Sequence, residues 1–374
     1  MKDMLKKRLT WLFLFGLIST QTRAQIDDRA TPQTKALYNN LHKSAQTGFL
    51  LGHQDALAYG VGWKYKPRKS DVYSVVGDYP ALYGWDLGYI ENDSPVNLDS
   101  VPFDKMKQYI REGYERGGVI TISWHGNNPL NDKSAWDVTP NSVQSILPGG
   151  PQHAKFLTWL DKIAAFLHDL KGKNGAPIPV LFRPYHELTG NWFWWGSSTC
   201  TPQEFKDLFR FTVHYFKDEK QLHNLIYVYN TSQTKDTTAF LERYPGDDVV
   251  DVLSFDAYQY DDPTTSSKFQ TEVLQNVKDI YQLAQTRHKI IAIAETGYEQ
   301  IPYAQWWTKT LLPAIGNYPV SYVLLWRNAG VMPGNKMHYY MPYPKHASAP
   351  DFKRFVQSPK VLLERDAKAL KLYK

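Results

Sequence analysis

The chain has 374 residues and a formal net charge of +6; residues 1–24 carry five basic side chains and one acid, so the remainder has about +2. No basic run stands out from an ordinary solvated surface, which leaves nucleic acid and anionic membranes unsupported as partners. The single cysteine, Cys200, excludes an internal disulfide and any zinc cluster built on cysteines.

The first 24 residues have the pattern of a secretory signal peptide. Lys6, Lys7 and Arg8 belong to a basic start, and residues 11–18 form an apolar stretch too short to span a bilayer. Small residues before Gln25 suit cleavage there, and no lipid-anchor cysteine follows. We therefore expect an exported protein, periplasmic or secreted, with a membrane anchor as the alternative interpretation of this segment.

Eight short apolar runs, rich in residues that favour β-strands, recur along the rest of the chain. They cover residues 49–53, 81–86, 119–124, 178–183, 225–230, 249–256, 289–295 and 320–327. Amphipathic stretches that predict helices separate most of them, at residues 104–116, 153–170, 202–216, 269–286, 303–315 and 351–371.

Strands that alternate with helices favour a parallel sheet. Eight nearly continuous apolar runs suit a closed (β/α)8 TIM barrel better than an open sheet with exposed edges. We therefore predict an α/β fold with one catalytic barrel domain over residues 25–374, and a doubly wound open sheet as the alternative.

In such barrels the functional groups lie where strands end, and the predicted strand ends here carry many ionisable and aromatic residues. They carry His53, Asp55, Trp85, Asp86, Trp124, His125, His186, Glu187, Asn230, Asp256, Tyr258, Glu295, Trp326 and Arg327. Aromatic residues at 192–195 follow Glu187, and such surroundings raise the pKa of a carboxylic acid, as a general acid requires. Glu187 is thus the candidate acid.

Glu295 ends the seventh run among small neighbours, and Arg183 or Arg327 could keep it ionised, as a carboxylate nucleophile must be. Strands four and seven lie on opposing sides of an eight-stranded barrel, so Glu187 and Glu295 can face each other over its mouth. A separation of about 5 to 5.5 Å between such carboxylates predicts hydrolysis of a glycosidic bond with retention, and a wider gap predicts inversion. Either glutamate alone could equally be a helix cap or a surface ion pair.

Sugars stack on indole rings and need polar partners for their hydroxyls, so a glycan cleft mixes tryptophan with histidine, acids and arginine. Trp192 and Trp326 are the candidate stacking residues, and His125 and His186 are candidate hydroxyl-binding groups or zinc ligands. A metal-dependent hydrolase is the rival interpretation, based on His53, Asp55, Asp86, His125, His186 and Asp256. The spacing of these residues is not specific for a metal, and we predict no metal site.

At these positions the chain resembles glycoside hydrolase family 26, the β-mannanases and related β-glycanases, over about residues 33–370. The matching fragments are Gly52-His53-Gln54, Ser123-Trp124-His125, Phe182-Arg183-Pro184-Tyr185-His186-Glu187, Asn191-Trp192, Ala294-Glu295 and Trp326-Arg327-Asn328. The resemblance implies a retaining β-1,4-mannanase that needs no cofactor, with relatives that cleave mixed-linkage β-glucan or β-1,3-xylan as alternatives.

The resemblance also implies roles for single residues. Glu187 would be the acid/base, Glu295 the nucleophile, and Tyr258 the donor to the nucleophile carboxylate. The subsite holding the reacting sugar would be shaped by His125, Trp192 and Trp326, with His186 before the acid/base. The resemblance extends substrate contact to Arg327 and, beyond it, to Asp86, Asn230 and Arg183.

Long segments at residues 126–152 and 328–350 exceed ordinary barrel connections and are expected cleft walls that favour short products such as mannobiose. The expected partner is β-mannan or a mannooligosaccharide, and the expected state is a monomer. A non-catalytic glycan-binding barrel is a further alternative, one that could lack either glutamate.

Overall fold

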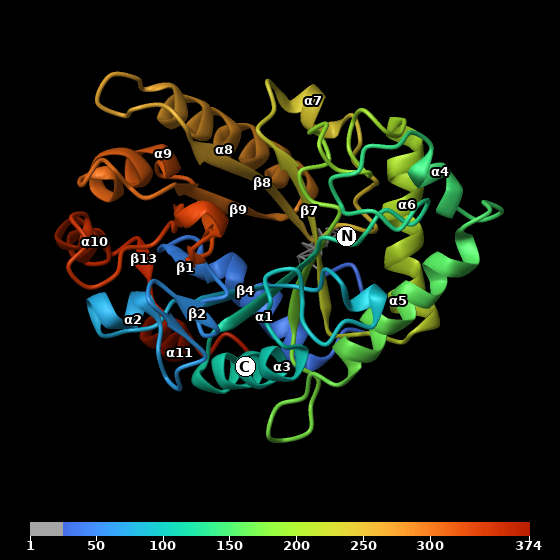
Figure 1. The fold of residues 1–374 in the computed structure, drawn as a ribbon, viewed down its shortest axis with the longest axis horizontal. Helices are drawn as coiled ribbons and strands as arrows, with labels where there is room; N and C mark the ends of the chain where they lie inside the picture. Colours follow the sequence, from blue (N-terminus) through green and yellow to red (C-terminus); the bar gives the residue numbers. More distant parts are fainter. Residues whose placement is uncertain (1–24) are drawn as a thin grey trace, which may run out of the picture.

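The computed structural model describes residues 25–374, in which parallel strands form a closed barrel inside a ring of helices (Figure 1). The barrel strands are β1 (Phe49–Gln54), β4 (Leu82–Asp86), β5 (Val119–Trp124), β6 (Val180–Pro184), β7 (Leu225–Ser232), β8 (Val252–Gln259), β9 (Ile290–Tyr298) and β10 (Val320–Leu325). Each strand pairs with the next, and β10 pairs in turn with β1, which closes the sheet. The predicted TIM barrel is confirmed, and the open-sheet alternative is wrong.

Helices of four to twenty residues pack around the outside of the barrel. They are α3 (Phe103–Arg116), α5 (His153–His168), α6 (Pro202–His214), α8 (Lys268–Arg287), α9 (Leu312–Ile315) and α11 (Glu364–Leu370). Helix α6 shows why they begin where they do: Thr201 and Glu204 form a capping box, and Pro202 occupies the first turn. Within residues 25–374, every helix is too short or too polar to cross a membrane. The predicted signal peptide lies outside the described residues.

The inward faces of the strands are apolar near the strand starts. Leu181 of β6, Ile226 of β7 and Val252 of β8 belong to one buried cluster inside the barrel. Helix α1 (Pro32–Ser44) adds Leu37 and Leu41 to this cluster and so closes the amino-terminal end of the barrel. Because strand side chains alternate, the next inward positions along the same strands lie toward the mouth. These rows end near the mouth in polar side chains, Arg183 of β6, Asn230 of β7 and Asp256 of β8.

The carboxyl-terminal region differs from the prediction. The expected helix at residues 351–371 is two helices, α10 (Ala349–Phe355) and α11, separated by the short strand β13 (Val361–Leu362). Pro359 cannot donate a helical hydrogen bond, and Val361 pairs with Phe49 of β1 instead. The prediction of one continuous helix there was therefore wrong.

Shorter elements occupy the connections between the barrel strands. They are β2 (Tyr59–Gly60), β3 (Trp63–Lys64), α2 (Asp71–Val76), α4 (Ser142–Ile146), α7 (Thr237–Leu241), β11 (Gly330–Val331) and β12 (Met337–His338), the 3-10 turns Ile90–Asn92 and Pro333–Asn335, and the π-helical turns Tyr215–Glu219 and Trp307–Leu311. The two long segments expected as cleft walls contain α4 and the β11–β12 hairpin. A third long connection, from β4 to α3, was not anticipated.

Candidate active site

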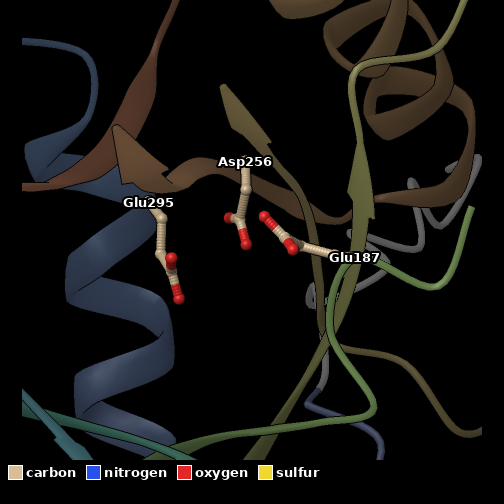
Figure 2. Close-up of side chains that lie close together, drawn as sticks. All are labelled: Glu187, Asp256 and Glu295. Atoms are coloured by element: carbon tan, nitrogen blue, oxygen red, sulfur yellow. The ribbon is translucent and has the colours of Figure 1, made fainter. Parts of the chain in front are cut away.

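Three carboxylates converge at the carboxyl-terminal mouth of the barrel (Figure 2). Glu187 follows β6, Asp256 lies in β8 and Glu295 lies in β9. One oxygen from each side chain lies within 4.8 Å of one oxygen of the other two. The two glutamates, more than one hundred residues apart in the chain, are therefore close enough to contact the same sugar ring.

A β-bulge turns Glu295 into the mouth. Phe255 of β8 pairs with Ile293 of β9, but the next residue, Asp256, pairs with Glu295, so β9 holds one extra residue here. Ala294 belongs to the cluster inside the barrel. Strict alternation would have sent Glu295 outward, toward the helices. The bulge places its carboxylate on the same side as Asp256.

Glu187 has an unusual backbone conformation. Its φ is +52°, and that of Tyr185 is +53°, both in the left-handed region that non-glycine residues rarely adopt. The Glu187 carbonyl accepts from the Gly190 amide at 2.8 Å, and the Trp192 indole donates to its carboxylate at 2.7 Å. Burial, together with the negative charge of Glu295, raises the pKa of Glu187 to about 7.

Arg183 holds the other two carboxylates. One guanidinium nitrogen donates to Asn230 Oδ1 at 2.5 Å and to Asp256 Oδ2 at 3.0 Å, and the other donates to Glu295 Oε1. The Tyr258 hydroxyl donates to the second Glu295 oxygen at 2.6 Å. Although burial lowers it, the pKa of Arg183 is raised by Asp256 and Glu295. Arg183 is thus a permanent cation bonded to both Asp256 and Glu295.

The residues predicted for a metal site do not form the group that the structure brings together. Among residues 25–374, the only close group of three or more metal-binding side chains is Glu187, Asp256 and Glu295, and it contains no histidine. Arg183 already donates to two of these carboxylates. A guanidinium in that position competes with a cation for the same oxygens, so the geometry favours acid/base chemistry over metal binding.

The two histidines of the site are joined to each other. His125 Nε2 and His186 Nε2 are 3.0 Å apart, and His125 Nδ1 lies 2.8 Å from Asp86 Oδ2. The Trp195 indole donates to the His186 carbonyl at 2.8 Å. Phe193 packs edge-on against both imidazole rings. This side of the mouth is therefore a rigid wall of rings.

The predicted stacking residues lie on the surface of the mouth. Trp192 is 39% exposed, with its indole N–H bonded to Glu187. Trp326 is half-buried, and its backbone amide donates to the Thr296 carbonyl at 3.0 Å. Trp136, which the sequence did not single out, is 50% exposed and stacks on His125 with ring centroids 5.3 Å apart.

Arg327 lies apart from the carboxylate pair. It bonds Asp99 at 3.0 Å, on the connection between β4 and α3, rather than Glu295. Both residues line a cavity of about 590 Å³, together with Tyr59 and Trp63 of the β2–β3 hairpin and Val331 of the β11–β12 hairpin. Arg183 alone of the two candidate arginines contacts Glu295.

Sequence reasoning missed Tyr59, Asp99 and Trp136. Each lies on a connection whose path depends on tertiary contacts, so strand-end position could not select it. The one available signal was the presence of aromatic residues within about eleven positions of strand-end motifs, as for Tyr59 after Gln54 and Trp136 after His125.

The sequence profile of glycosyl hydrolase family 26 matches residues 26–311. The chain belongs to this family. Its fold is similar to that of a family 26 β-mannanase from Bacteroides ovatus, with a TM-score of 0.87 and 44% identity over 92% of this chain and 98% of that one. For a modular endo-β-1,4-mannanase from Cellulomonas fimi, the TM-score is 0.82 and the identity 32%, over 92% of this chain and 78% of that one.

The matches to curated relatives cover only part of each relative's length. A mannan endo-1,4-β-mannosidase from Bifidobacterium adolescentis is 33% identical over 355 residues, which cover 90% of this chain and 35% of that protein. One from Bacillus subtilis is 31% identical over 201 residues, 51% of this chain and 53% of that protein. The chain therefore spans about a third to a half of the length of these curated relatives.

Proposed function

We propose that this family 26 chain is a retaining β-1,4-mannanase, with Glu187 as acid/base and Glu295 as nucleophile. The observation that carries the proposal is the pair itself: two glutamates with oxygens within 4.8 Å, one raised in pKa and one held by Arg183 and Tyr258. This short distance fits the roughly 5 to 5.5 Å of retaining enzymes better than the wider gap of inverting ones.

In the first step, Glu295 attacks the anomeric carbon of the bound sugar. The bond to the leaving oxygen breaks as Glu187 gives that oxygen its proton, and the sugar becomes an ester of Glu295. Arg183 and Tyr258 each bond one oxygen of Glu295, so they hold the carboxylate in a fixed orientation before attack.

In the second step, Glu187 takes a proton from water, and the resulting hydroxide attacks the anomeric carbon and releases Glu295. The negative charge of Glu295 is one cause of the raised pKa of Glu187. Esterification removes that charge, so the pKa of Glu187 falls in the intermediate. The same residue is therefore protonated when an acid is needed and ionised when a base is needed.

The sugar that reacts would lie between the rings around the two glutamates. Trp192 and Trp326 offer ring faces, and His125 and His186 place their imidazole rings on the same side of the mouth. Arg327 lines the adjoining cavity, where a neighbouring sugar would lie. Trp192 also contacts the proposed acid/base, because its indole N–H donates to the Glu187 carboxylate. We assign these five residues to substrate binding.

The substrate is assigned from the relatives, whose names specify mannan. The Bacteroides ovatus and Cellulomonas fimi proteins are described as mannanases. One assay of reducing-sugar release from mannan, glucomannan, lichenan and β-1,3-xylan tests the assignment. We expect the fastest release from mannan. Faster release from lichenan or β-1,3-xylan would transfer the proposal to one of the alternative family activities.

We further propose that the cleft favours short products such as mannobiose. The β11–β12 hairpin and the connection carrying Asp99 enclose the 590 Å³ cavity around Arg327, on one side of the mouth. A time course on mannohexaose tests this. Mannobiose should dominate from the earliest samples, and a broad early ladder of sizes would contradict the proposal.

The remaining proposals concern export, cofactors and assembly. We propose that residues 1–24 are removed on export to the periplasm or the medium, leaving a monomer that needs no cofactor. The mass of the mature chain from the native host tests cleavage before Gln25.

The absence of a cofactor is tested with a chelator. Full activity after this treatment is expected, and its loss would favour the metal-dependent alternative. Sedimentation of the mature chain tests the monomer.

A further inference from the structure

Asp86, His125 and His186 form a continuous chain of hydrogen bonds across the ends of β4, β5 and β6. Asp86 is the last residue of β4, His125 directly follows β5, and His186 follows β6 next to the proposed acid/base Glu187. The links are 2.8 Å from Asp86 to His125 and 3.0 Å from His125 to His186. All three side chains are buried.

Asp86 accepts hydrogen bonds at both of its oxygens. Oδ1 accepts from the backbone amides of Gly88 at 2.7 Å and His125 at 3.2 Å, and Oδ2 accepts from the Ser123 hydroxyl at 2.6 Å. Burial alone would raise the pKa of Asp86, but the charge of His125 and these donors lower it to about 2. The carboxylate is therefore ionised, and His125 Nδ1 must be the donor in the fourth bond.

The second nitrogen of His125 faces His186. The titratable groups that interact with His125 are Asp86 of β4, Asp99 of the connection after β4, His186 and Glu187 after β6, and Glu295 of β9. Arg183 of β6 acts on His186. Burial lowers the pKa of His125, but Asp86, Glu295 and Asp99 together raise it above its usual value, with Asp86 contributing most. For His186, burial and the nearby charge of His125 lower the pKa. His125 is thus the imidazolium that donates, and His186 is the neutral ring that accepts.

The ring of His186 has one hydrogen bond that orients it. Its Nε2 meets His125, whereas its Nδ1 is buried with no partner within residues 25–374. His186 also lies between Tyr185 and Glu187, which are both in the left-handed conformation. Backbone of this kind persists only where its surroundings hold it. The hydrogen bond from His125 therefore helps to hold the strained segment that carries Glu187 in place.

We propose that Asp86 is a positioning residue for the proposed acid/base: through His125 it orients the His186 ring and holds a positive charge beside Glu187. This inference rests on the proposed function of Glu187. Asp86 touches neither the substrate nor Glu187 and acts only through the two histidines. The competing view is that Asp86 is a structural anchor that only joins β4 to the backbone after β5.

The experiment compares Asp86→Asn with a matched buried control, Asp251→Asn. Asp251 lies before β8, is fully buried, and accepts from the backbone amides of Ile26 and Tyr227 at 2.8 and 2.9 Å. Both variants lose a buried carboxylate that binds backbone amides, but only Asp86→Asn disturbs His125. If Asp86→Asn folds poorly, His125→Asn replaces it, because the amide can still donate to Asp86 while the contact with His186 is lost.

Two readouts are needed, nitrogen NMR of the histidines and the pH dependence of mannan hydrolysis. In the unmodified protein both His125 nitrogens should be protonated at pH 6, and in Asp86→Asn the His125 pKa should fall by about one unit or more. For Asp86→Asn, kcat should drop about ten- to hundredfold with little change in KM. Loss of the imidazolium charge raises the pKa of Glu187, so the basic limb of kcat/KM should move to higher pH.

Other outcomes overturn the inference in identifiable ways. An unchanged His125 titration in Asp86→Asn, or a basic limb that stays in place while kcat falls no further than in Asp251→Asn, would leave Asp86 a structural anchor. If the unmodified protein hydrolyses none of the tested glycans, the proposed function has failed. The role of Asp86 toward a general acid would fail with it, whereas an NMR shift in Asp86→Asn would still show that Asp86 controls the charge of His125.

Discussion

The two ends of the barrel are equally buried but chemically opposite. On β6, Leu181 near the strand start faces inward into an apolar cluster, and Arg183, two residues later on the same row, bonds two carboxylates. Buried ion pairs contribute little to stability and are costly when one partner is lost, whereas buried leucine stabilises directly. The contrast indicates that the amino-terminal end holds the fold together and the mouth is arranged for chemistry.

Replacing the two glutamates is the strongest test of whether the mouth carries the catalytic groups. Glu295→Ala and Glu187→Ala should each lower kcat/KM for mannan by several orders of magnitude, on the order of 10⁴-fold, because each removes a reacting group. Glu364→Gln is a matched control: Glu364 is also buried, bonded by Tyr83 and Arg116, and remote from the mouth. It should retain activity.

Azide separates the two glutamate roles. With an activated aryl β-mannoside, Glu295→Ala should use azide in place of the missing nucleophile and release an α-mannosyl azide. Glu187→Ala still forms the ester with Glu295, so azide should release a β-mannosyl azide. Products of the opposite configuration would reverse the assignment.

A substitution at Arg183 tests whether the mouth depends on charge balance. Arg183→Met leaves Asp256 and Glu295 buried without their cation, so we expect a loss of about 3 to 5 kcal/mol in the free energy of unfolding. Activity should fall as well, because Glu295 loses a donor that orients its carboxylate. Denaturant unfolding and kcat measurements check both. A variant with unchanged stability would show that Arg183 does not compensate these carboxylates.

Trp192→Phe tests the hydrogen bond to Glu187, and its effect should be smaller than that of Arg183→Met. The indole N–H favours the ionised carboxylate, so its removal raises the pKa of Glu187 above about 7. The acid then stays protonated to higher pH, and the basic limb of kcat/KM should move upward by less than about one pH unit. A limb that moves downward would contradict the contact.

Leu181→Ala should affect catalysis least, since Leu181 lies at the apolar end. Its fully buried side chain predicts a loss of about 2 to 5 kcal/mol in the free energy of unfolding. At temperatures where the variant remains folded, kcat and the pH profile should match those of the unmodified protein. A changed pH profile would show that the two ends are coupled.

Much of the barrel follows from local pattern. Apolar runs such as residues 290–294 end in ionisable residues, and in a parallel barrel all such ends meet at one mouth. This is why Glu187 and Glu295 could be singled out as candidates before any geometry was known, and why the strand order was recoverable.

The remaining features depend on contacts that no local pattern contains. The bulge that turns Glu295 inward arises from pairing with both neighbouring strands, and the left-handed φ of Glu187 from its surroundings. Arg327 was an equal candidate to Arg183 because each ends a predicted apolar run, and only the fold places Arg327 against Asp99. Residues 351–371 have helical periodicity, yet pairing of Val361 with Phe49 interrupts them.

The proposed role of the two glutamates is tested most directly by the configuration of the first product. Proton NMR of mannohexaose hydrolysis, recorded in the first minutes, distinguishes the anomers before they interconvert. Our account predicts that the β-anomer appears first and the α-anomer grows only by mutarotation. Initial appearance of the α-anomer would mean inversion, which contradicts a glycosyl ester on Glu295.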